Sequence, residues 1–348
     1  MKLDSSRSRS VRDFSADVEA VAELIAQTQL DSGEIPWCPG QKTDPWDHIE
    51  AAMGLSIGGY TQQARRAFEW FARVQLEDGS CYSAYQQGLP EDKTRETNLS
   101  SYVAVGVYHY YLITRDDNIL KEMWPCISAA IDFALSLQTD EGEIYWALNP
   151  EGSVDPMALL TGCSSIYMSI KCALAVANIL GHTQPLWKEG LKRLENAIKF
   201  KPYLFNMTKS RYSMDWFYPV LTGAVSGFEA QDRIDTYWKK FIIEDRGVKC
   251  VSDEPWVTIA ETSELCLALS AMGNRELARI VFSWISDRRY EDGSFWCGFV
   301  CPDIIIWPED KIAWTNAAAL MAADAIYNLS PASQIFNHQF WESYDFSA

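Results

Sequence analysis

Acidic side chains stand beside tryptophans in several segments of this chain, a combination that could perform acid–base chemistry on a sugar. The densest segment is Asp44-Pro-Trp-Asp-His-Ile-Glu50, which brings carboxylates, a tryptophan and a histidine into seven residues. Tryptophan offers a flat apolar face on which a sugar ring can stack, while carboxylates bind hydroxyls and exchange protons. The pattern, together with the total of 14 tryptophans, favours a carbohydrate as substrate.

Other segments of this kind precede expected helices: Arg95-Glu96, the run around Arg211 and Asp215, and the tryptophan and acid pairs within 301–316. Structural explanations also exist, because Asp47 could cap a helix and Glu96 could interact with a helix dipole. The run around Arg211 could equally form a buried cluster of ion pairs. On the functional interpretation, the substrate-binding residues are Trp46, Asp47, His48, Glu50, Arg95, Glu96, Arg211, Asp215, Trp216, Trp256, Trp307 and Trp314.

Glu261 and Glu264 could supply catalytic carboxyls. Their spacing of three places them on one face of a helix, from which both could point into a central cavity. Hydrolysis of a glycosidic bond needs one protonated and one ionised carboxyl on opposite sides of the sugar, and a tryptophan wall that excludes water raises the pKa of the first. Solvated surface glutamates are the alternative explanation.

A repeated pattern indicates how such residues are positioned. Segments 29–37, 75–82, 138–146 and 289–296 each contain a long side chain, an acidic turn, a glycine and an aromatic residue. An apolar segment of helical period precedes each one, and the glycine stands where a left-handed residue would end the helix. The glycines therefore mark helix ends in a helical-repeat protein.

The periodicity predicts about twelve helices and little that alternates as strands do. Tight turns such as 58–61, 114–118 and 272–275 join neighbouring helices into antiparallel hairpins. Six hairpins closed in a ring would form an all-α (α/α)6 toroid with its long acidic loops at one end. The helices are expected near 14–29, 47–58, 61–76, 98–114, 118–138, 160–180, 186–199, 210–223, 229–241, 257–272, 275–288 and 312–328.

Composition agrees with one sizeable body. The chain has 348 residues, 48% of them apolar, and no linker-like segment, so we expect a single domain over 1–348 with residues 1–13 flexible. The formal charge of −17 argues against nucleic acid as a partner. We find no apolar run or leader that would indicate membrane insertion, and the nine cysteines mostly read as small buried hydrophobes. A cytoplasmic protein acting on a small molecule or oligosaccharide is expected, and the oligomeric state is left open.

The segment from Trp46-Asp47-His-Ile-Glu-Ala-Ala-Met-Gly-Leu through Gly59-Tyr-Thr-Gln-Gln-Ala to Gly79 resembles the opening hairpin of the glucoamylase-like six-hairpin glycosidases. Weaker similarity continues, in order, around Thr114, at 160–181 and at 271–278. The resemblance covers about half of the chain. It implies hydrolysis of a glycosidic bond, with inversion at the anomeric carbon, and it implies that Asp47 holds the sugar at the point of cleavage.

The resemblance also implies catalytic roles. The general base of the family lies in the last hairpin, where Glu309 in Trp-Pro-Glu is the matching residue. The paired glutamates that supply the family's general acid would fall near 146–155, where this chain has Glu151 and Asp155 instead. Asp155, or failing it Glu151, is then the acid. Glu261 is a competitor from the neighbouring hairpin.

A second resemblance uses the repeats. Gln-x-x-x-Gly-x-x-aromatic segments after helices are similar to those of squalene/hopene cyclases and protein prenyltransferase β-subunits, which share an α/α toroid with an aromatic-lined cavity. An enzyme acting on an isoprenoid is therefore the alternative function. The Asp-x-Asp-Asp acid of the cyclases is absent, however, and Asp116-Asp117 reads as a surface turn.

The sequence predicts no metal site and no cofactor. Cys301-Pro-Asp303 lacks a clear third zinc ligand, because His338 is the only late histidine. A sugar epimerase would need two positioned histidines, for which only His48 and His109 could serve. A non-catalytic sugar-binding toroid is a further alternative, because helical repeats also build binding scaffolds.

Overall fold

Two kinds of helix alternate along the chain. One kind is buried on nearly every side; all residues of α11, for example, are buried, and such a helix must be covered all round. It comprises α2 (Pro45–Ile57), α5 (Val103–Thr114), α7 (Leu160–Leu180), α9 (Ser213–Leu221), α11 (Ile259–Ala271) and α13 (Ala313–Tyr327). The other kind buries one face only, and it comprises α1 (Val11–Thr28), α3 (Thr61–Val74), α6 (Asp117–Ser136), α8 (Pro185–Phe200), α10 (Gly227–Phe241) and α12 (Arg275–Ser283).

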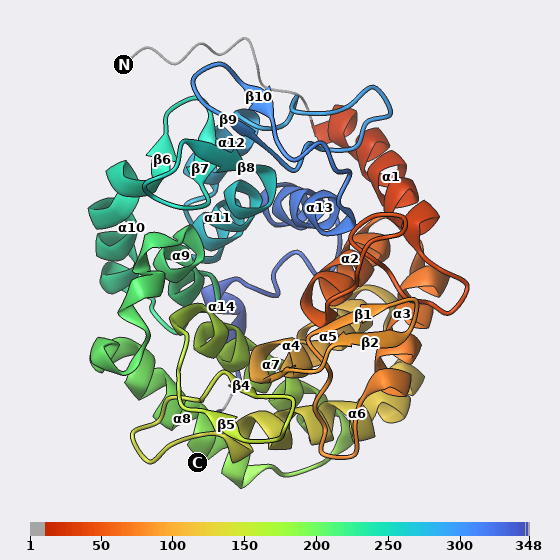
Figure 1. The fold of residues 1–348 in the computed structure, drawn as a ribbon, viewed down its shortest axis with the longest axis vertical. Coiled ribbons are helices and arrows are strands. Elements are labelled where there is room, and N and C mark those ends of the chain that lie inside the picture. Colours follow the sequence, from red (N-terminus) through yellow and green to blue (C-terminus); the bar gives the residue numbers. More distant parts are fainter. Residues whose placement is uncertain (1–10, 345, 347–348) are drawn as a thin grey trace.

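The fully buried helices form a closed inner ring. In the computed structural model, which describes residues 11–344 and 346, α2 packs against α5, α5 against α7, α7 against α9, α9 against α11, α11 against α13, and α13 against α2. The one-sided helices lie outside this ring, as Figure 1 shows. Each outer helix and the inner helix that follows it form one hairpin. The predicted all-α (α/α)6 toroid is therefore confirmed.

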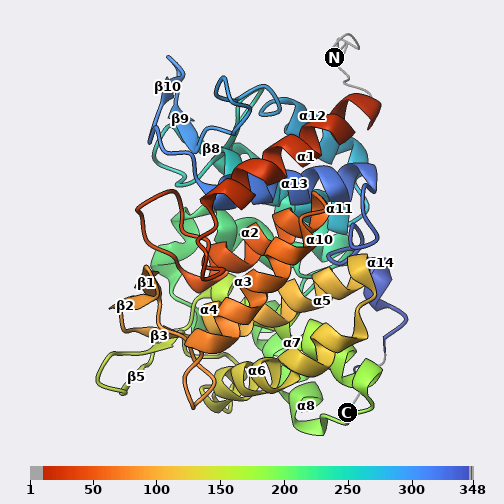
Figure 2. The same cartoon turned by 90° about the vertical axis from the view of Figure 1, so that its right-hand side faces the viewer.

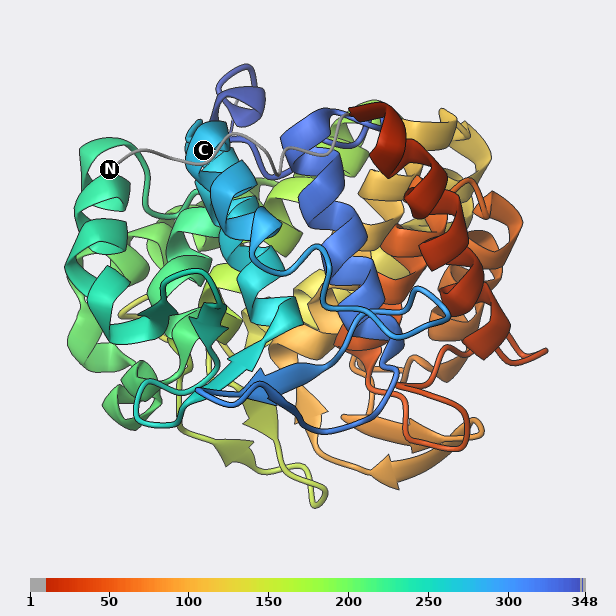
Figure 3. The ribbon, with the colours of Figure 1, turned by 90° about the horizontal axis from the view of Figure 1, so that it is seen from above.

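Short strands gather at one end of the ring, which we call the strand end (Figures 2 and 3). Within the described residues they form three small antiparallel sheets. These are β1 (Ala84–Gln86) with β2 (Leu89–Asp92); β3 (Arg95–Glu96), β4 (Ala147–Leu148) and β5 (Val154–Asp155); and β6 (Ile242–Ile243), β7 (Gly247–Lys249), β8 (Trp256–Thr258), β9 (Gly298–Val300) and β10 (Ile305–Ile306). Because each connection from an outer to an inner helix crosses this end, the inner helices all begin there.

The opposite end, which we call the turn end, carries the short turns from inner to outer helices and the short helix α14 (His338–Trp341) (Figure 3). α14 was not predicted, because four residues give no periodicity. The other short helices are α4 (Thr97–Ser101), before α5, and two 3-10 helices, Pro202–Leu204 and Met207–Arg211. The long predicted helices agree with the observed ones to within a few residues.

The repeated glutamines connect adjacent outer helices. The Gln75 side-chain amide donates to the carbonyl of Gly79 in its own turn at 3.0 Å and to the carbonyl of Cys126 on α6 at 2.9 Å. Gln29 does the same toward Gly33 and Gln63, and Gln138 toward Gly142 and Gly190. In the fourth copy Arg289 replaces glutamine and forms an ion pair of 3.5 Å with Asp17 on α1. The repeat is thus a structural device that joins one hairpin to the next.

The glycine of the repeat is needed for close approach. Gly79 has φ of +87°, and a Cβ built there would lie 2.0 Å from the carbonyl oxygen of Ala129 on α6. Gly142 is similarly placed, 2.4 Å from the carbonyl oxygen of Arg193 on α8. Any other residue would push the turn away from the neighbouring outer helix.

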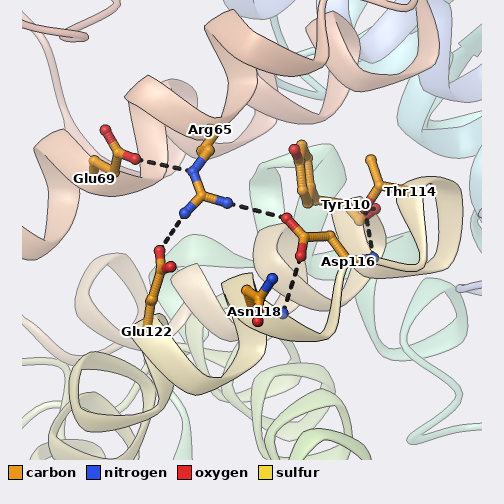
Figure 4. A network of polar contacts seen from close by, with 7 residues as sticks. All are labelled: Arg65, Glu69, Tyr110, Thr114, Asp116, Asn118 and Glu122. Atoms are coloured by element: carbon orange, nitrogen blue, oxygen red, sulfur yellow. Dashed lines mark hydrogen bonds and ion pairs between the residues drawn. The ribbon is translucent and has the colours of Figure 1, made fainter.

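Charged side chains also join the outer helices, as Figure 4 shows around Arg65. This guanidinium on α3 contacts Glu69 at 3.1 Å and Asp116 at 3.0 Å, and it pairs with Glu122 on α6. Asp116 also caps α6 by accepting the backbone N–H of Asn118. The prediction that Asp116-Asp117 is a surface turn is correct.

Two further predictions concern the N-terminal stretch and membrane insertion. Residues 1–10 of the stretch 1–13 expected to be flexible lie outside the described residues, whereas 11–13 belong to α1. Among the described helices, α7 is long and apolar enough to cross a membrane by length and composition. It is, however, largely buried between α5 and α9 in the inner ring, which is the position of a core helix.

Candidate active site

The first turns of the inner helices bring acidic side chains to the strand end. Asp47 and Glu50 lie in the first two turns of α2, Glu261 and Glu264 lie in those of α11, and Asp215 lies in the first turn of α9. A helix N-terminus carries a partial positive charge that favours carboxylates. Because all inner helices begin at this end, residues far apart in the sequence meet there.

Glu50 is the most fully bonded of these acids. Its Oε1 accepts hydrogen bonds from the indole of Trp46 and from the hydroxyl of Tyr102, both at 2.9 Å, and its Oε2 accepts one from the indole of Trp314. Burial raises the pKa of Glu50 to about 7, although these three donors lower it. With both oxygens occupied, Glu50 holds α2, α5 and α13 in register and is not free for substrate.

Asp44 and Asp47 form an interacting carboxyl pair at the start of α2. Asp44 Oδ1 accepts the backbone N–H of Asp47 at 2.9 Å and thereby caps the helix, while its Oδ2 accepts the indole N–H of Trp37 at 2.7 Å. Burial raises the pKa of Asp47 well above its ordinary value, and the charges of Asp44, Glu50 and Glu264 raise it further. The Asp47 side chain is nevertheless partly exposed. Its surroundings therefore favour the protonated form, and a ligand can still reach it.

Glu264 is buried beside Tyr218, whose hydroxyl donates to its Oε1 at 2.8 Å. Its Oε2 has no hydrogen-bond partner among the described residues. Burial raises the pKa of Glu264 well above the ordinary value, and the charges of Glu50 and Glu261 add to this. Glu264 is therefore a second buried carboxyl in which the protonated form is favoured.

Glu261 lies one turn before Glu264 and is 7% exposed. It interacts with the thiol of Cys250, whose pKa is raised by burial and by the charge and hydrogen bond of Glu261. Burial raises the pKa of the Cys297 thiol, and the charges of Glu261, Asp310 and Asp47 raise it further. Cys297 thus interacts electrostatically with both Asp47 on α2 and Glu261 on α11, two helices that α13 separates in the ring.

Glu96 stands at the edge of the same end. Burial raises its pKa to about 7, a hydrogen bond with Ser83 opposes the shift, and the charges of Asp44 and Asp92 increase it. Glu96 therefore interacts electrostatically with Asp44 at the start of α2, and its role in substrate binding stays a prediction.

Three predicted ligand residues are structural. The His48 ring is fully buried, accepts the N–H of Ile35 at 3.1 Å on Nδ1 and binds the carbonyl of Ala67 at 2.9 Å through Nε2. Trp216 is buried between α9 and α10, where it stacks on Phe241. Trp46 is covered by Tyr102 at 4.6 Å and by Tyr218 at 5.5 Å between ring centroids. These three predictions of direct sugar contact need correction, because each side chain already has protein partners.

The predicted basic and acidic partners are also largely engaged. Arg95 pairs with Asp78 at 2.6 Å, and Arg211 pairs with Asp253 at 2.6 Å. Asp215 accepts hydrogen bonds from the hydroxyl and the backbone N–H of Thr161, at 2.6 Å and 3.2 Å. The Arg211–Asp253 pair is exposed, so it is a surface ion pair and not part of the buried cluster that was the alternative explanation.

Asp155 and Glu309, the acid and base implied by the glucoamylase resemblance, are less buried than these acids, and Asp155 lies in line with Glu96 through Ala147 of the strand between them. Asp155 is half-buried on β5, the outer strand of its sheet. Glu309 is exposed in the loop before α13, near Tyr290. Glu151, the substitute acid, is exposed in the turn between β4 and β5. Only Glu261 of the predicted catalytic residues lies in the buried acidic group.

Two predicted tryptophans remain available at the strand end. Trp307 is 56% exposed, and the half-buried Trp256 packs against it edge to face with ring centroids 5.1 Å apart. The Trp256 indole donates to the carbonyl of Trp307 at 2.8 Å, which fixes the pair. Trp314 is also partly exposed. These aromatic surfaces suit stacking against sugar rings.

Tyr102 and Tyr218 are the site residues that the sequence analysis missed. Tyr102 lies in an apolar helical segment, where a tyrosine reads as core, and only the fold brings its hydroxyl to Glu50. Tyr218 stands in the aromatic run after Arg211, which was noted for its charges.

Within the described part of the chain, no group of three or more His, Cys, Asp or Glu side chains is arranged to hold a metal ion.

Comparisons with known proteins agree on a sugar-processing architecture. No family model matches the chain. The chain is 46% identical over 315 residues to an MMP endo-(1,4)-3-O-methyl-alpha-D-mannosidase of Mycolicibacterium hassiacum, an alignment that covers 90% of this chain and 87% of the mannosidase.

Solved structures share the fold at low sequence identity. A wild-type glycosidase matches with a TM-score of 0.68 at 14% identity, covering 94% of this chain and 100% of the other. A GH63 mannosylglycerate hydrolase from Thermus thermophilus, in complex with glucose, matches at 0.68 and 12%, covering 87% and 99%. A D-mannose isomerase matches at 0.67 and 12%, covering 92% and 98%. These three likenesses concern the toroid alone.

Proposed function

The chain belongs to the glycosidase family of that endo-mannosidase and is a glycoside hydrolase. We propose that it cleaves bonds between α-(1,4)-linked mannose units that carry 3-O-methyl groups. The identity of 46% over nine-tenths of the chain carries this proposal. An O-methyl group is apolar and cannot donate a hydrogen bond, so the exposed aromatic surface of Trp307 and Trp256 at the strand end suits it.

We propose Asp47 as the general acid. A general acid must be protonated near neutral pH and must reach the leaving oxygen. Burial and the neighbouring charges of Asp44, Glu50 and Glu264 favour its protonated form, and the partial exposure of the side chain leaves it open to a ligand. In the reaction, the Asp47 proton passes to the glycosidic oxygen as its bond to the anomeric carbon breaks.

We propose Glu261 as the general base. It projects from α11, on the far side of α13 from Asp47, and near the same Cys297. Of the two α11 glutamates, Glu264 is held by Tyr218, whereas Glu261 retains some exposure. The carboxylate of Glu261 would take a proton from a water molecule. The oxygen of that water attacks the anomeric carbon at the same time, which inverts the configuration.

The deciding experiment compares four variants on an α-(1,4)-linked 3-O-methylmannose oligosaccharide. Asp47→Asn and Glu261→Gln are expected to lower kcat about 10²- to 10⁴-fold, the range typical of general acid–base catalysis. Asp155→Asn and Glu309→Gln, the pair implied by the glucoamylase resemblance, are expected to retain activity within a few-fold. Proton NMR of the early products should show the β anomer at the newly formed end.

Each alternative result has a distinct meaning. Loss of activity in Glu309→Gln with retention in Glu261→Gln would assign the base to the last hairpin. An initial α anomer would exclude inversion. Hydrolysis of unmethylated α-(1,4)-mannosides at an equal kcat/KM would contradict the methylated substrate while leaving the hydrolase intact.

A further inference from the structure

A second cavity opens at the turn end of the ring, opposite the carboxylates. Its volume is about 480 Å³, within the range of small-molecule sites. It lies between the inner helix α7, the turns that follow α9 and α11, and α14 with the segment after it. Its lining includes Lys171, Gly223, Gly227, Met272, His338 and Trp341. The hydrolytic mechanism uses none of these residues.

Lys171 places a buried amine in this cavity. It is 4% exposed, and its Nζ donates to the carbonyl of Thr222 at 3.2 Å. The ring centroids of Trp341 and Tyr167 lie 4.7 Å and 5.3 Å from Nζ. Lys171 forms no ion pair with any carboxylate of the described residues, although an ammonium group has three N–H donors. A buried amine with one polar partner is incompletely satisfied.

His338 stands beside Lys171. Its Nε2 binds the carbonyl of Val220 at 2.7 Å, which leaves Nδ1 for another partner. Gly223 adopts φ of +76°, and a Cβ built there would lie 3.5 Å from Lys171 Nζ and 3.2 Å from His338 Cδ2. The absence of a side chain at Gly223 therefore keeps the space in front of both nitrogen-bearing groups clear.

The N-terminus of α10 reaches the same cavity. Ser226 is the N-cap residue, but its side chain makes no capping hydrogen bond, so the first backbone N–H groups of this 15-residue helix lack that partner. Ser226 and Gly227 both line the cavity. A helix N-terminus favours anions through these N–H groups and the helix dipole. Lys171 and His338, which carry a positive charge when protonated, and the N-terminus of α10 thus surround one space in a chain of formal charge −17.

We propose that this cavity binds a compact organic anion, such as a sugar phosphate or sugar acid, with its anionic group between Lys171, His338 and the N-terminus of α10. The apolar part of the ligand would contact Trp341 and Met272, which line the cavity. The exposed carboxylate of Glu342 lies at the same cavity and would disfavour ligands whose second charge is directed toward it. This site is independent of the proposed hydrolysis.

Proton uptake provides a specific signature. Burial lowers the pKa of Lys171 to about 7, opposed by the charges of Cys172 on its own helix and of Glu195 on α8. Burial lowers the pKa of His338 on α14, the hydrogen bond with the Val220 carbonyl opposes this shift, and the Lys171 charge lowers the pKa further. Above pH 7 the amine is mostly neutral, and a bound anion would favour its protonated form. Binding at pH 8 should therefore take up close to one proton.

Isothermal titration calorimetry of the full chain at pH 8, in two buffers of different ionisation enthalpy, tests the proposal. The ligands are inorganic phosphate, glucose 6-phosphate, glucuronate and glucose. We expect saturable binding of at least one organic anion with proton uptake, and none of glucose. Lys171→Met should weaken binding at least tenfold and abolish the uptake, and His338→Gln should weaken it less. The exposed Lys192→Met on α8, with the same change of side chain, should leave binding unchanged.

Asp47→Asn should bind the anion as the wild type does, which separates this cavity from the strand end. Absence of saturable binding by the wild-type protein for all three anions would overturn the proposal. So would binding that a folded Lys171→Met variant retains, or binding that Asp47→Asn loses. If Lys171→Met fails to fold, the proposal is tested by saturable binding to the wild-type protein and by weaker binding to His338→Gln. The phosphate and carboxylate ligands distinguish the two kinds of anion.

Discussion

The indole of Trp314 on α13 donates a hydrogen bond to Oε2 of Glu50 on α2, although 264 residues separate the two. The same carboxyl binds Tyr102 at the entrance to α5. One buried glutamate therefore joins the first, second and last hairpins, at the point where the ring closes. Glu50 lies one turn after Asp47 on α2, so ring closure and the position of the proposed acid are linked.

We expect the Trp314–Glu50 contact to be energetically coupled. Trp314→Phe removes the indole donor and leaves Oε2 of a buried carboxyl unsatisfied, which typically costs about 1–3 kcal/mol. Glu50→Gln also destabilises the fold, and the double variant should be less destabilised than the sum by about 1 kcal/mol or more. Urea unfolding of the four proteins measures this coupling. Strict additivity would contradict a direct role for the contact in stability.

The alkaline limb of activity should depend on Asp44. Burial and then the charge of Asp44 raise the pKa of Asp47. Asp44→Asn removes that charge but keeps a good helix N-cap. If Asp47 is the acid, activity falls as it ionises, so the alkaline limb of kcat/KM should move to lower pH in Asp44→Asn. The exposed Asp140→Asn is the matched control. An unmoved limb in Asp44→Asn would argue against Asp47.

His48 should stabilise the fold at neutral pH and lose that effect in acid. Burial lowers its pKa to about 4 in the folded protein, below the unfolded value of about 6.5. As pH falls below 6.5 the unfolded state takes up a proton first, so stability decreases, by about 2 kcal/mol at pH 5. His48→Gln should be less stable than the wild type at pH 7.5, with a smaller difference at pH 5. Urea unfolding at both pH values measures this. An equal difference at the two would refute the assignment.

The repeat glutamines should contribute to stability and not to catalysis. Gln75→Leu removes a bond to Gly79 within its own turn and a bond to Cys126 that joins the end of α3 to α6, and it leaves both carbonyls without that donor. We expect a loss of about 1–3 kcal/mol in the free energy of unfolding, with kcat unchanged. Gln62→Leu, an exposed position on the same helix, should change stability by less than about 0.5 kcal/mol. A loss of kcat in Gln75→Leu at full stability would point to a functional repeat.

Because the inner ring is continuous, we propose that the chain forms a single domain.

The helical periodicity and the glycine-closed repeats predicted the hairpins. The six-hairpin glycosidase resemblance predicted both the fold and the hydrolase activity, and these two predictions are confirmed. The resemblance to isoprenoid enzymes drew on the same repeats. Those repeats join neighbouring hairpins, as Gln75 shows. They therefore indicate the toroid fold and do not indicate which reaction the protein catalyses.

The sequence by itself determined the helices, their order and the acidic, aromatic character of one end, because period, caps and glycine turns are local properties. It could not separate Asp47 and Glu261 from Asp155 and Glu309, since all four are carboxylates in the loops and first helical turns of one end of the ring. Nor could it show that His48 and Trp216 point into the core. Those distinctions depend on burial and on partners far along the chain, such as Trp314 with Glu50, and only closure of the ring decides them.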